Sequence, residues 1–177
     1  MSAVQIKKIE MKPSGKLTLE FEHSADGRVS DHVGKFDDPP APEFDSAMAR
    51  LATHVCDVLE VSRSMAARIH PQSVQYSYLK DGRMSAIIAC SFSMPVGGTE
   101  TDIKTPKTKC PMDEHESGKP GYFSDDAVNA LWELQQEALK YLSGHRAQSN
   151  LFDMDAEAED VPEGVQIAGG NVLRIAQ

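Results

Sequence analysis

The segment 124–144, SDDAVNALWELQQEALKYLSG, decides the fold of this chain. Its apolar residues recur every three or four positions, as on one face of an amphipathic helix: Ala127, Val128, Leu131, Leu134 or Gln135, Ala138, Leu139 and Leu142. Ser124 is a favourable N-cap, and Gly144 supplies the left-handed residue that ends many helices. Because the apolar face must be covered by another element, we expect Trp132, which lies beside it, to be buried against a sheet.

The residues before this helix predict several strands and one further helix. Apolar alternation or continuous apolar character predicts strands over 4–11, 17–22, 74–78, 84–94 and 99–108. Helical spacing runs from 44 to 61, and a helical turn is expected at 65–68. The segment 29–36 is either a short edge strand or part of an irregular connection.

The resulting order, β-β-α-β-β-β-α, predicts an α+β fold with an antiparallel sheet and two helices packed on one face. Asp81-Gly82 indicates a tight hairpin between the third and fourth strands. In the strand at 84–94, Ile87 and Ala89 add apolar residues to the second face, which favours a central strand covered on both sides. The two halves show no repeat of residues.

Length and charge predict one domain with an acidic tail. The 177 residues divide into an α+β domain at 1–144, an exposed motif with an acidic linker at 145–164, and a terminal apolar peptide at 165–177, either docked or loose. Six acidic residues between 153 and 163 account for six of the nine net negative charges, so the folded part is only mildly acidic.

The same composition predicts a cytoplasmic protein. No apolar run reaches the roughly 20 residues of a membrane helix, and residues 1–8 lack the apolar core of a secretion signal. Three cysteines at unpatterned spacings indicate reduced thiols. We therefore expect no membrane partner.

The sequence favours a non-enzymatic protein without a metal or other cofactor. Cys110 and His115 have the spacing of half a zinc site, but no second ligand pair occurs. The chain has no Gly-x-Ser-x-Gly elbow, phosphate-binding loop or dinucleotide fingerprint. The carboxylates around His115 are typical of a solvated loop, so we assign no catalytic residue.

Three lysines raise the possibility of contact with nucleic acid. Lys104 and Lys107 lie in the strand expected at 99–108, and Lys109 follows it directly. On an edge strand, lysines commonly prevent unwanted pairing. The functional alternative is a patch that contacts phosphates, with Tyr76 and Tyr78 as platforms on which the bases of a single strand stack.

The peptide 148–152, QSNLF, follows the helix stop directly. Its apolar residues, Leu151 and Phe152, come too late to join the apolar face of the helix and are followed by acidic residues. An extended peptide can present both to a hydrophobic pocket while Gln148 supplies directional hydrogen bonds. The alternative is that both residues pack back on Trp132 or on the sheet.

This peptide resembles the short linear motif by which bacterial proteins dock on the replicative sliding clamp. Gln148 matches the leading glutamine, Asn150 the polar position, and Leu151 with Phe152 the apolar pair. Ser149 and Asn150 depart from the commonest residues at their positions. The segments TPKTK at 105–109 and YLSGHRAQSNLFD at 141–153 also resemble small phage- or prophage-encoded proteins found among replication and recombination genes.

Together these features favour a non-enzymatic accessory protein of phage DNA replication or recombination. It is expected to dock on a protein partner, such as the sliding clamp, through Gln148, Asn150, Leu151 and Phe152. One alternative is a single-stranded nucleic-acid-binding protein with an autoinhibitory acidic tail. Another is a phage inhibitor of a host factor, which would share most of these features.

Overall fold

Three antiparallel strands begin the fold: β1 (Ala3–Met11), β2 (Leu17–Ala25) and β3 (Arg28–Phe36). The computed structural model describes residues 3–25, 27–94 and 96–146. The elements that follow are α1 (Pro42–Val58), the 3-10 helix η1 (Arg63–Arg68), β4 (Ile69–Tyr78), β5 (Met84–Ser93), β6 (Glu100–Lys104), β7 (Thr108–Lys109) and α2 (Asp125–Leu142).

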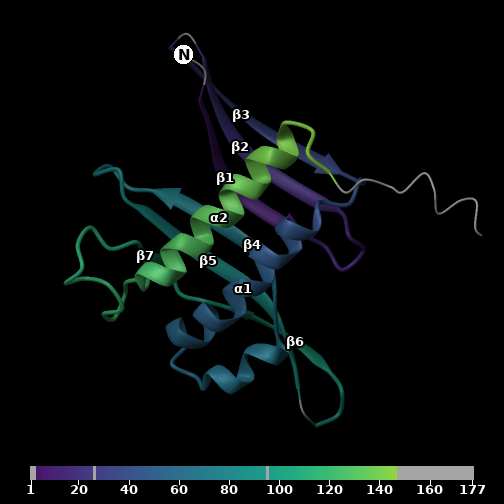
Figure 1. Ribbon diagram of the computed structural model, residues 1–177, viewed down its shortest axis with the longest axis vertical. Helices are drawn as coiled ribbons and strands as arrows, with labels where there is room; N and C mark the ends of the chain where they lie inside the picture. The colour runs from purple at the N-terminus through teal and green to yellow at the C-terminus, as the bar shows by residue number, and fades with distance from the viewer. Residues whose placement is uncertain (1–2, 26, 95, 147–177) are drawn as a thin grey trace, which may run out of the picture. The chain divides into compact units, whose positions relative to one another are not determined.

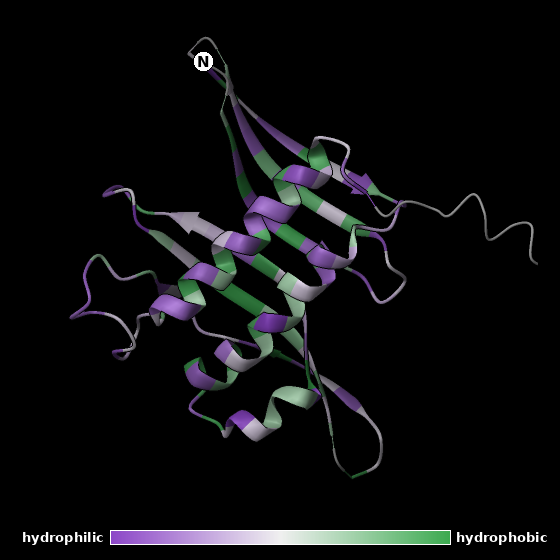
Figure 2. Cartoon of the chain, viewed as in Figure 1, coloured by the Kyte–Doolittle hydropathy of each residue, from purple (hydrophilic) through white to green (hydrophobic). Residues whose placement is uncertain are grey.

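The strands form one antiparallel sheet in the order β3-β2-β1-β4-β5-β6, with β7 paired to β5. Helices α1 and α2 cross the same face of this sheet (Figure 1). Hydrophobic bands mark the strands behind the helices, whereas polar residues cover much of the outer side of the helices (Figure 2). The expected α+β class, with an antiparallel sheet and helices on one face, is confirmed.

The core lies between the two helices and the sheet. Its fully buried large side chains come from both layers: Ile6, Ile9, Leu17, Leu19, Phe44, Leu51, Val55, Ile88, Phe123, Leu131, Leu134 and Tyr141. The caps of α2 are those expected from the sequence. The Ser124 hydroxyl accepts a hydrogen bond from the Ala127 N–H at 3.3 Å, and Gly144 adopts φ +100° after the last turn.

The prediction that Trp132 is buried was wrong: its side chain is 48% exposed. Leu131 and Leu134 point into the core and are fully buried, together with Gln135 and Ala138. Trp132 is one residue, about 100°, away from Leu131 around the helix, and the neighbouring helix leaves that flank uncovered.

Several boundaries differ from the sequence prediction for identifiable reasons. The segment 29–36 belongs to a nine-residue strand, β3, so three strands precede α1. The strand expected at 99–108 is divided into β6 and β7, with Pro106 between them. Helix α1 ends at Val58, earlier than expected, and Glu60 closes it at φ +55°, a conformation that glycine normally marks.

The expectation that β5 is covered on both faces was also wrong. Ile88 and Cys90, on the helix side, are fully buried, whereas Ile87 and Ala89 on the other side are only half buried. Among the described residues, α1 and α2 lie on the same side of the sheet, so no long helix covers the face that carries Ile87 and Ala89.

The two halves of the fold share an order of elements that the sequence does not reveal as a repeat of residues. Each half contains three long or medium strands followed by a long helix, and the second half adds the two-residue β7; β1 pairs with β4 at the centre, where Ile9 faces Val74. The first hairpins match as well: Gly15 at φ +81° and Gly82 at φ +84° close turns with the same hydrogen-bond pattern.

Substitutions on α2 test this orientation of the helix. Leu134→Ala should lower the free energy of unfolding by about 2–5 kcal/mol, because it opens a cavity in the core. Trp132→Ala should lower it by about 1 kcal/mol or less, as expected for a side chain that is half exposed. Urea unfolding of the two variants and the parent measures the difference, and an equal or larger loss for Trp132→Ala would contradict this orientation.

Candidate functional site

The predicted docking residues Gln148, Asn150, Leu151 and Phe152 lie outside the described residues. The structure does describe the point from which they follow, at Arg146. The Arg146 guanidinium forms an ion pair with Asp38 and lies 5.0 Å from the ring centroid of Tyr141 and 5.7 Å from that of Phe36. The Tyr141 hydroxyl donates a hydrogen bond to the Asp38 carbonyl at 2.8 Å.

These contacts anchor the chain after α2 against the end of β3. A β-bridge between Pro40 and Arg146 adds a backbone contact at the same place. Arg146 is therefore held by charge, by two aromatic rings and by the backbone. The peptide 148–152 begins two residues beyond this anchor.

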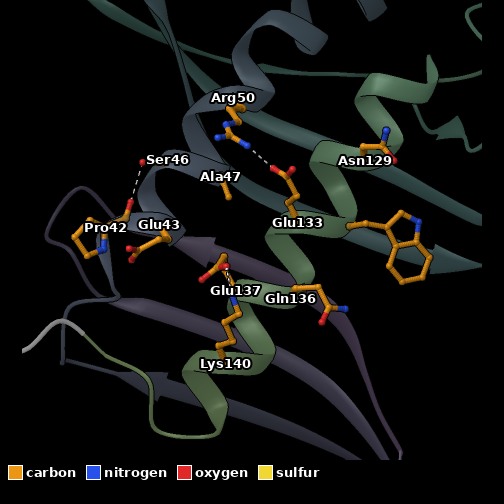
Figure 3. A pocket seen from close by; sticks show the side chains of 11 residues that line it. Pro42, Glu43, Ser46, Ala47, Arg50, Asn129, Glu133, Gln136, Glu137 and Lys140 are labelled. Atoms are coloured by element: carbon orange, nitrogen blue, oxygen red, sulfur yellow. Dashed lines mark hydrogen bonds and ion pairs between the residues drawn. The ribbon is translucent and has the colours of Figure 1, made fainter.

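A groove between α1 and α2 has a volume of about 800 Å³ (Figure 3). Arg50 of α1 extends toward Glu133 of α2 and forms an ion pair across it, and Lys140 pairs with Glu137 along α2. The half-exposed Trp132 lines the groove. A half-exposed tryptophan beside polar walls is a frequent feature of protein-binding surfaces.

The sequence assigned Trp132 to the core and therefore missed this surface. The sequence feature that could have indicated an exposed side chain is the position of Trp132, which lies beside the apolar face of α2 and not on it. Tryptophan at such a flank is either covered by a neighbouring helix or left as a contact residue. Only the placement of α1 distinguishes the two outcomes.

The two tyrosines proposed as stacking platforms lie on the helix-covered face of the sheet. Tyr76 is only 3% exposed, and its hydroxyl donates to the Leu131 carbonyl at 3.2 Å. Burial raises its pKa well above the ordinary value. A ring in this position has no face open to a base, so Tyr76 is removed from the candidate nucleic-acid surface.

Tyr78 closes a polar network inside the fold. Its hydroxyl donates to the Ile6 carbonyl at 3.0 Å and accepts from the Gln135 amide at 2.9 Å. The ammonium group of Lys7 lies 5.4 Å from its ring centroid. Gln135 is itself buried and also contacts the sulfur of Met84 at 3.3 Å. The hydrogen bonds of Tyr78 therefore connect β1, β4 and α2.

The three candidate lysines are exposed but lie in different settings. Lys104 ends β6, Lys107 lies in the connection after it, and Lys109 belongs to β7. Lys107 lines a second cavity of about 430 Å³, together with Lys119 and the start of α2. The hypothesis of single-stranded nucleic-acid binding therefore retains its three exposed lysines but loses Tyr76 as a stacking residue.

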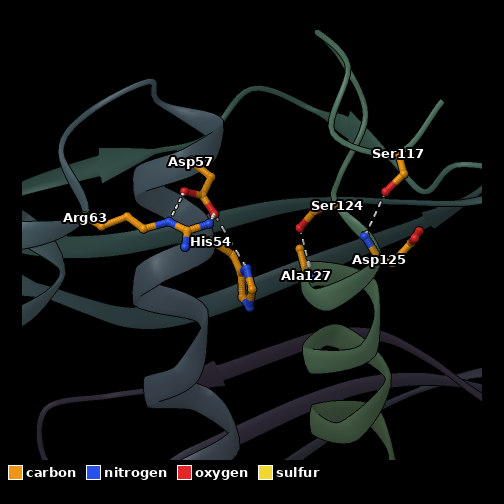
Figure 4. A network of polar contacts seen from close by, with 7 residues as sticks. All are labelled: His54, Asp57, Arg63, Ser117, Ser124, Asp125 and Ala127. Carbon is orange, nitrogen blue, oxygen red and sulfur yellow. Dashed lines mark hydrogen bonds and ion pairs between the residues drawn. The ribbon is translucent and has the colours of Figure 1, made fainter. Parts of the chain in front are cut away.

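The second cavity also contains a polar cluster, in which His54 projects from α1 toward the start of α2 (Figure 4). Its Nδ1 is buried, has no hydrogen-bond partner, and lies 3.9 Å from Asp57 Oδ2. Arg63 donates two hydrogen bonds to Asp57, at 2.8 and 3.0 Å. Burial lowers the pKa of His54 and the Arg63 charge adds to this, while Asp57 and Asp126 oppose it.

The residues considered for zinc or thiol chemistry do not come together. Cys110 is buried and His115 is exposed. Within the described part of the chain, no three His, Cys, Asp or Glu side chains are placed to share a metal ion. Burial raises the pKa of Cys90 to about 12 and that of Cys110 to about 11, which keeps both thiols protonated near neutral pH.

Comparisons of the chain with protein-family models, with curated proteins and with solved structures found no match. Of the helices that the structure describes, none combines the length and the apolar character required to cross a membrane.

Tyr78→Phe tests the buried network. The change should lower the free energy of unfolding by about 1–3 kcal/mol, because it leaves the Ile6 carbonyl and the Gln135 amide without their partner. A double-mutant cycle with Gln135→Leu, measured by urea unfolding, should show coupling between the two side chains. Unchanged stability of Tyr78→Phe would show that the network does not form.

The His54 cluster predicts a pH-dependent stability. Unfolded histidine binds its proton near pH 6.5, whereas His54 in the fold binds it only at lower pH. Its stabilising contribution is therefore complete above about pH 6.5 and is lost as the pH falls through the lowered folded-state pKa. His54→Gln should reduce the fall in the free energy of unfolding between about pH 7.5 and pH 5. His70→Gln, at an exposed strand position, is the control; an unchanged pH slope in His54→Gln would refute the assignment.

Proposed function

We propose that this protein is a non-enzymatic accessory factor of DNA replication or recombination that docks on a protein partner through the peptide 148–152. The partner that this peptide fits best is the bacterial sliding clamp. The resemblance of QSNLF to clamp-binding peptides identifies the partner class. Gln148 and Asn150 provide hydrogen bonds, and Leu151 and Phe152 provide the apolar anchors.

The observation that carries this proposal is the anchored end of the described fold. Helix α2 is capped at Ser143 and Gly144, and Arg146 is held against Asp38, Phe36 and Tyr141. Tyr141 is the last fully buried side chain among the described residues. The peptide therefore follows a fixed point on a folded domain, as a presented linear motif requires.

The chemistry of the tail is consistent with docking of moderate affinity. Leu151 and Phe152 together offer two apolar anchors, each worth about 1.5–3 kcal/mol when fully buried in a partner pocket. Ordering a peptide on binding opposes part of that gain, so we expect micromolar affinity. The following acids, Asp153 and Asp155, are strongly hydrated, which disfavours burial of this segment in the parent domain.

The tail proposal is tested with the full chain and purified sliding clamp. Leu151→Ala combined with Phe152→Ala should weaken binding at least about tenfold, because both apolar anchors are lost. The same double variant should melt within about one degree of the parent, since surface changes affect stability little. Isothermal titration calorimetry and thermal unfolding measure the two effects.

A matched control lies in the same tail. Val172→Ala combined with Leu173→Ala removes a similar amount of apolar surface outside the motif and should leave clamp binding unchanged. If the motif variant binds as the parent does, the docking proposal fails. If it instead melts several degrees lower, Leu151 and Phe152 belong to the core of the domain and the proposal fails for that reason.

A further inference from the structure

Strand β3 is a free edge of the sheet along its whole length. All nine of its residues, Arg28–Phe36, pair with β2 without a bulge, and among the described strands none pairs with its other side. Val29 and Val33 are each 64% exposed. The strand at the opposite end of the sheet, β6, has only five residues. A long, regular and exposed edge is a template for pairing with another strand.

The hairpin between β2 and β3 determines which backbone groups of the edge face outward. Ala25 and Arg28 flank a two-residue connection, and such a flanking pair exchanges both of its hydrogen bonds. Because hydrogen-bonded and non-hydrogen-bonded pairs alternate, every second residue of β3 bonds to β2. The others direct their N–H and C=O groups away from the sheet: Val29, Asp31, Val33 and Lys35.

The side chains of these same residues lie on the sheet face opposite the helices. They share that face with their cross-strand partners in β2, Glu22 opposite Asp31 and Thr18 opposite Lys35. Of the ion pairs between described residues, none involves Asp31 or Lys35. Asp31 faces the like charge of Glu22 across the ladder, and the cation nearest that pair, Lys7, is bound to Glu22 at 2.9 Å and not to Asp31.

The spacing of these residues is self-complementary. In an antiparallel pairing of β3 with a second β3, Val33 can face Val33 on the twofold axis. Asp31 of each copy then lies opposite Lys35 of the other, so that one pairing creates two ion pairs. The exposed valines meet between them, and the facing residues are those whose backbone groups point outward.

We propose that two copies of this chain associate through antiparallel pairing of their β3 strands, centred on Val33. The two sheets become one continuous sheet. Other registers allowed by the hydrogen-bond alternation lose the charge pairs: a shift of two residues places Asp31 opposite Val33 or opposite Asp37. Because two nine-residue edges bury less surface than a standard stable interface, we expect a dissociation constant in the micromolar range.

Charge-exchange variants of the full chain test the pairing. Asp31→Lys brings two pairs of like charges together and should raise the dimer dissociation constant about tenfold or more. Lys35→Asp should do the same. The double variant, Asp31→Lys with Lys35→Asp, exchanges the charges and should restore association. Sedimentation velocity over a concentration series measures the dissociation constants, and Asp102→Lys on the other edge strand is the control that should leave association unchanged.

Cross-linking tests the register independently. Paired residues exchanging hydrogen bonds have Cα atoms about 5.5 Å apart, which a disulfide can span. Val33→Cys should therefore form a disulfide-linked dimer with oxidised glutathione. Val29→Cys is equally exposed, but its two copies would lie about 27 Å apart in this register and should stay unlinked. The three native cysteines are buried and serve as an internal background.

Two outcomes would overturn the proposal. The first is a parent chain that sediments as a monomer at every concentration in the series. The second is a dimer that Asp31→Lys leaves intact, or in which Val29→Cys links as readily as Val33→Cys. Thermal unfolding of each variant separates lost association from lost folding, and a variant that fails to fold is replaced by Val33→Asp, which should also abolish the dimer.

Discussion

The two halves of the fold meet where β1 pairs with β4, and Ile9 faces Val74 at this point. Of the strand pairs between β3 and β6, this one is the shortest. Only three residue pairs join β1 to β4. Within each half, the strands are joined by hairpins with many more pairs. A ladder of this length is a weak joint by itself, so the side chains and helices that cross it must hold the halves together.

Helix α2 supplies much of that connection. It packs on β1 of the first half, and its Leu131 carbonyl accepts the hydrogen bond of Tyr76 from the second half. The Gln135 amide of α2 donates to the Tyr78 hydroxyl of β4, which in turn donates to the Ile6 carbonyl in β1. Buried polar groups that satisfy one another in this way specify one arrangement of the surrounding elements.

The edge strand β3 and the end of the described chain at Arg146 both lie at the periphery of the domain. The ring of Phe36, the last residue of β3, contacts Arg146, where the described chain ends. The proposed dimer edge and the start of the proposed docking tail are therefore close to each other on the domain. A dimer would carry two tails, and two linked motifs of micromolar affinity bind a partner with repeated pockets more tightly than one motif does.

Sequence by itself determined the features that depend on short-range periodicity and local backbone chemistry. The α2 helix, its Ser124 cap and its Gly144 end follow from residue spacing and from the conformations these residues prefer. The alternation of apolar residues over 17–22 likewise identified the strand β2. These patterns were sufficient for the α+β class and for the placement of both helices on one face.

Tertiary structure alone decided which surfaces remain free. Alternation placed Tyr76 and Tyr78 on one side of a strand, but whether helices cover that side depends on contacts between distant segments. The exposure of Trp132 depends on where α1 lies, and the free edge of β3 depends on β1 pairing with β4. Local sequence carries no information on these pairings, because burial of a side chain is set by the elements that pack against it.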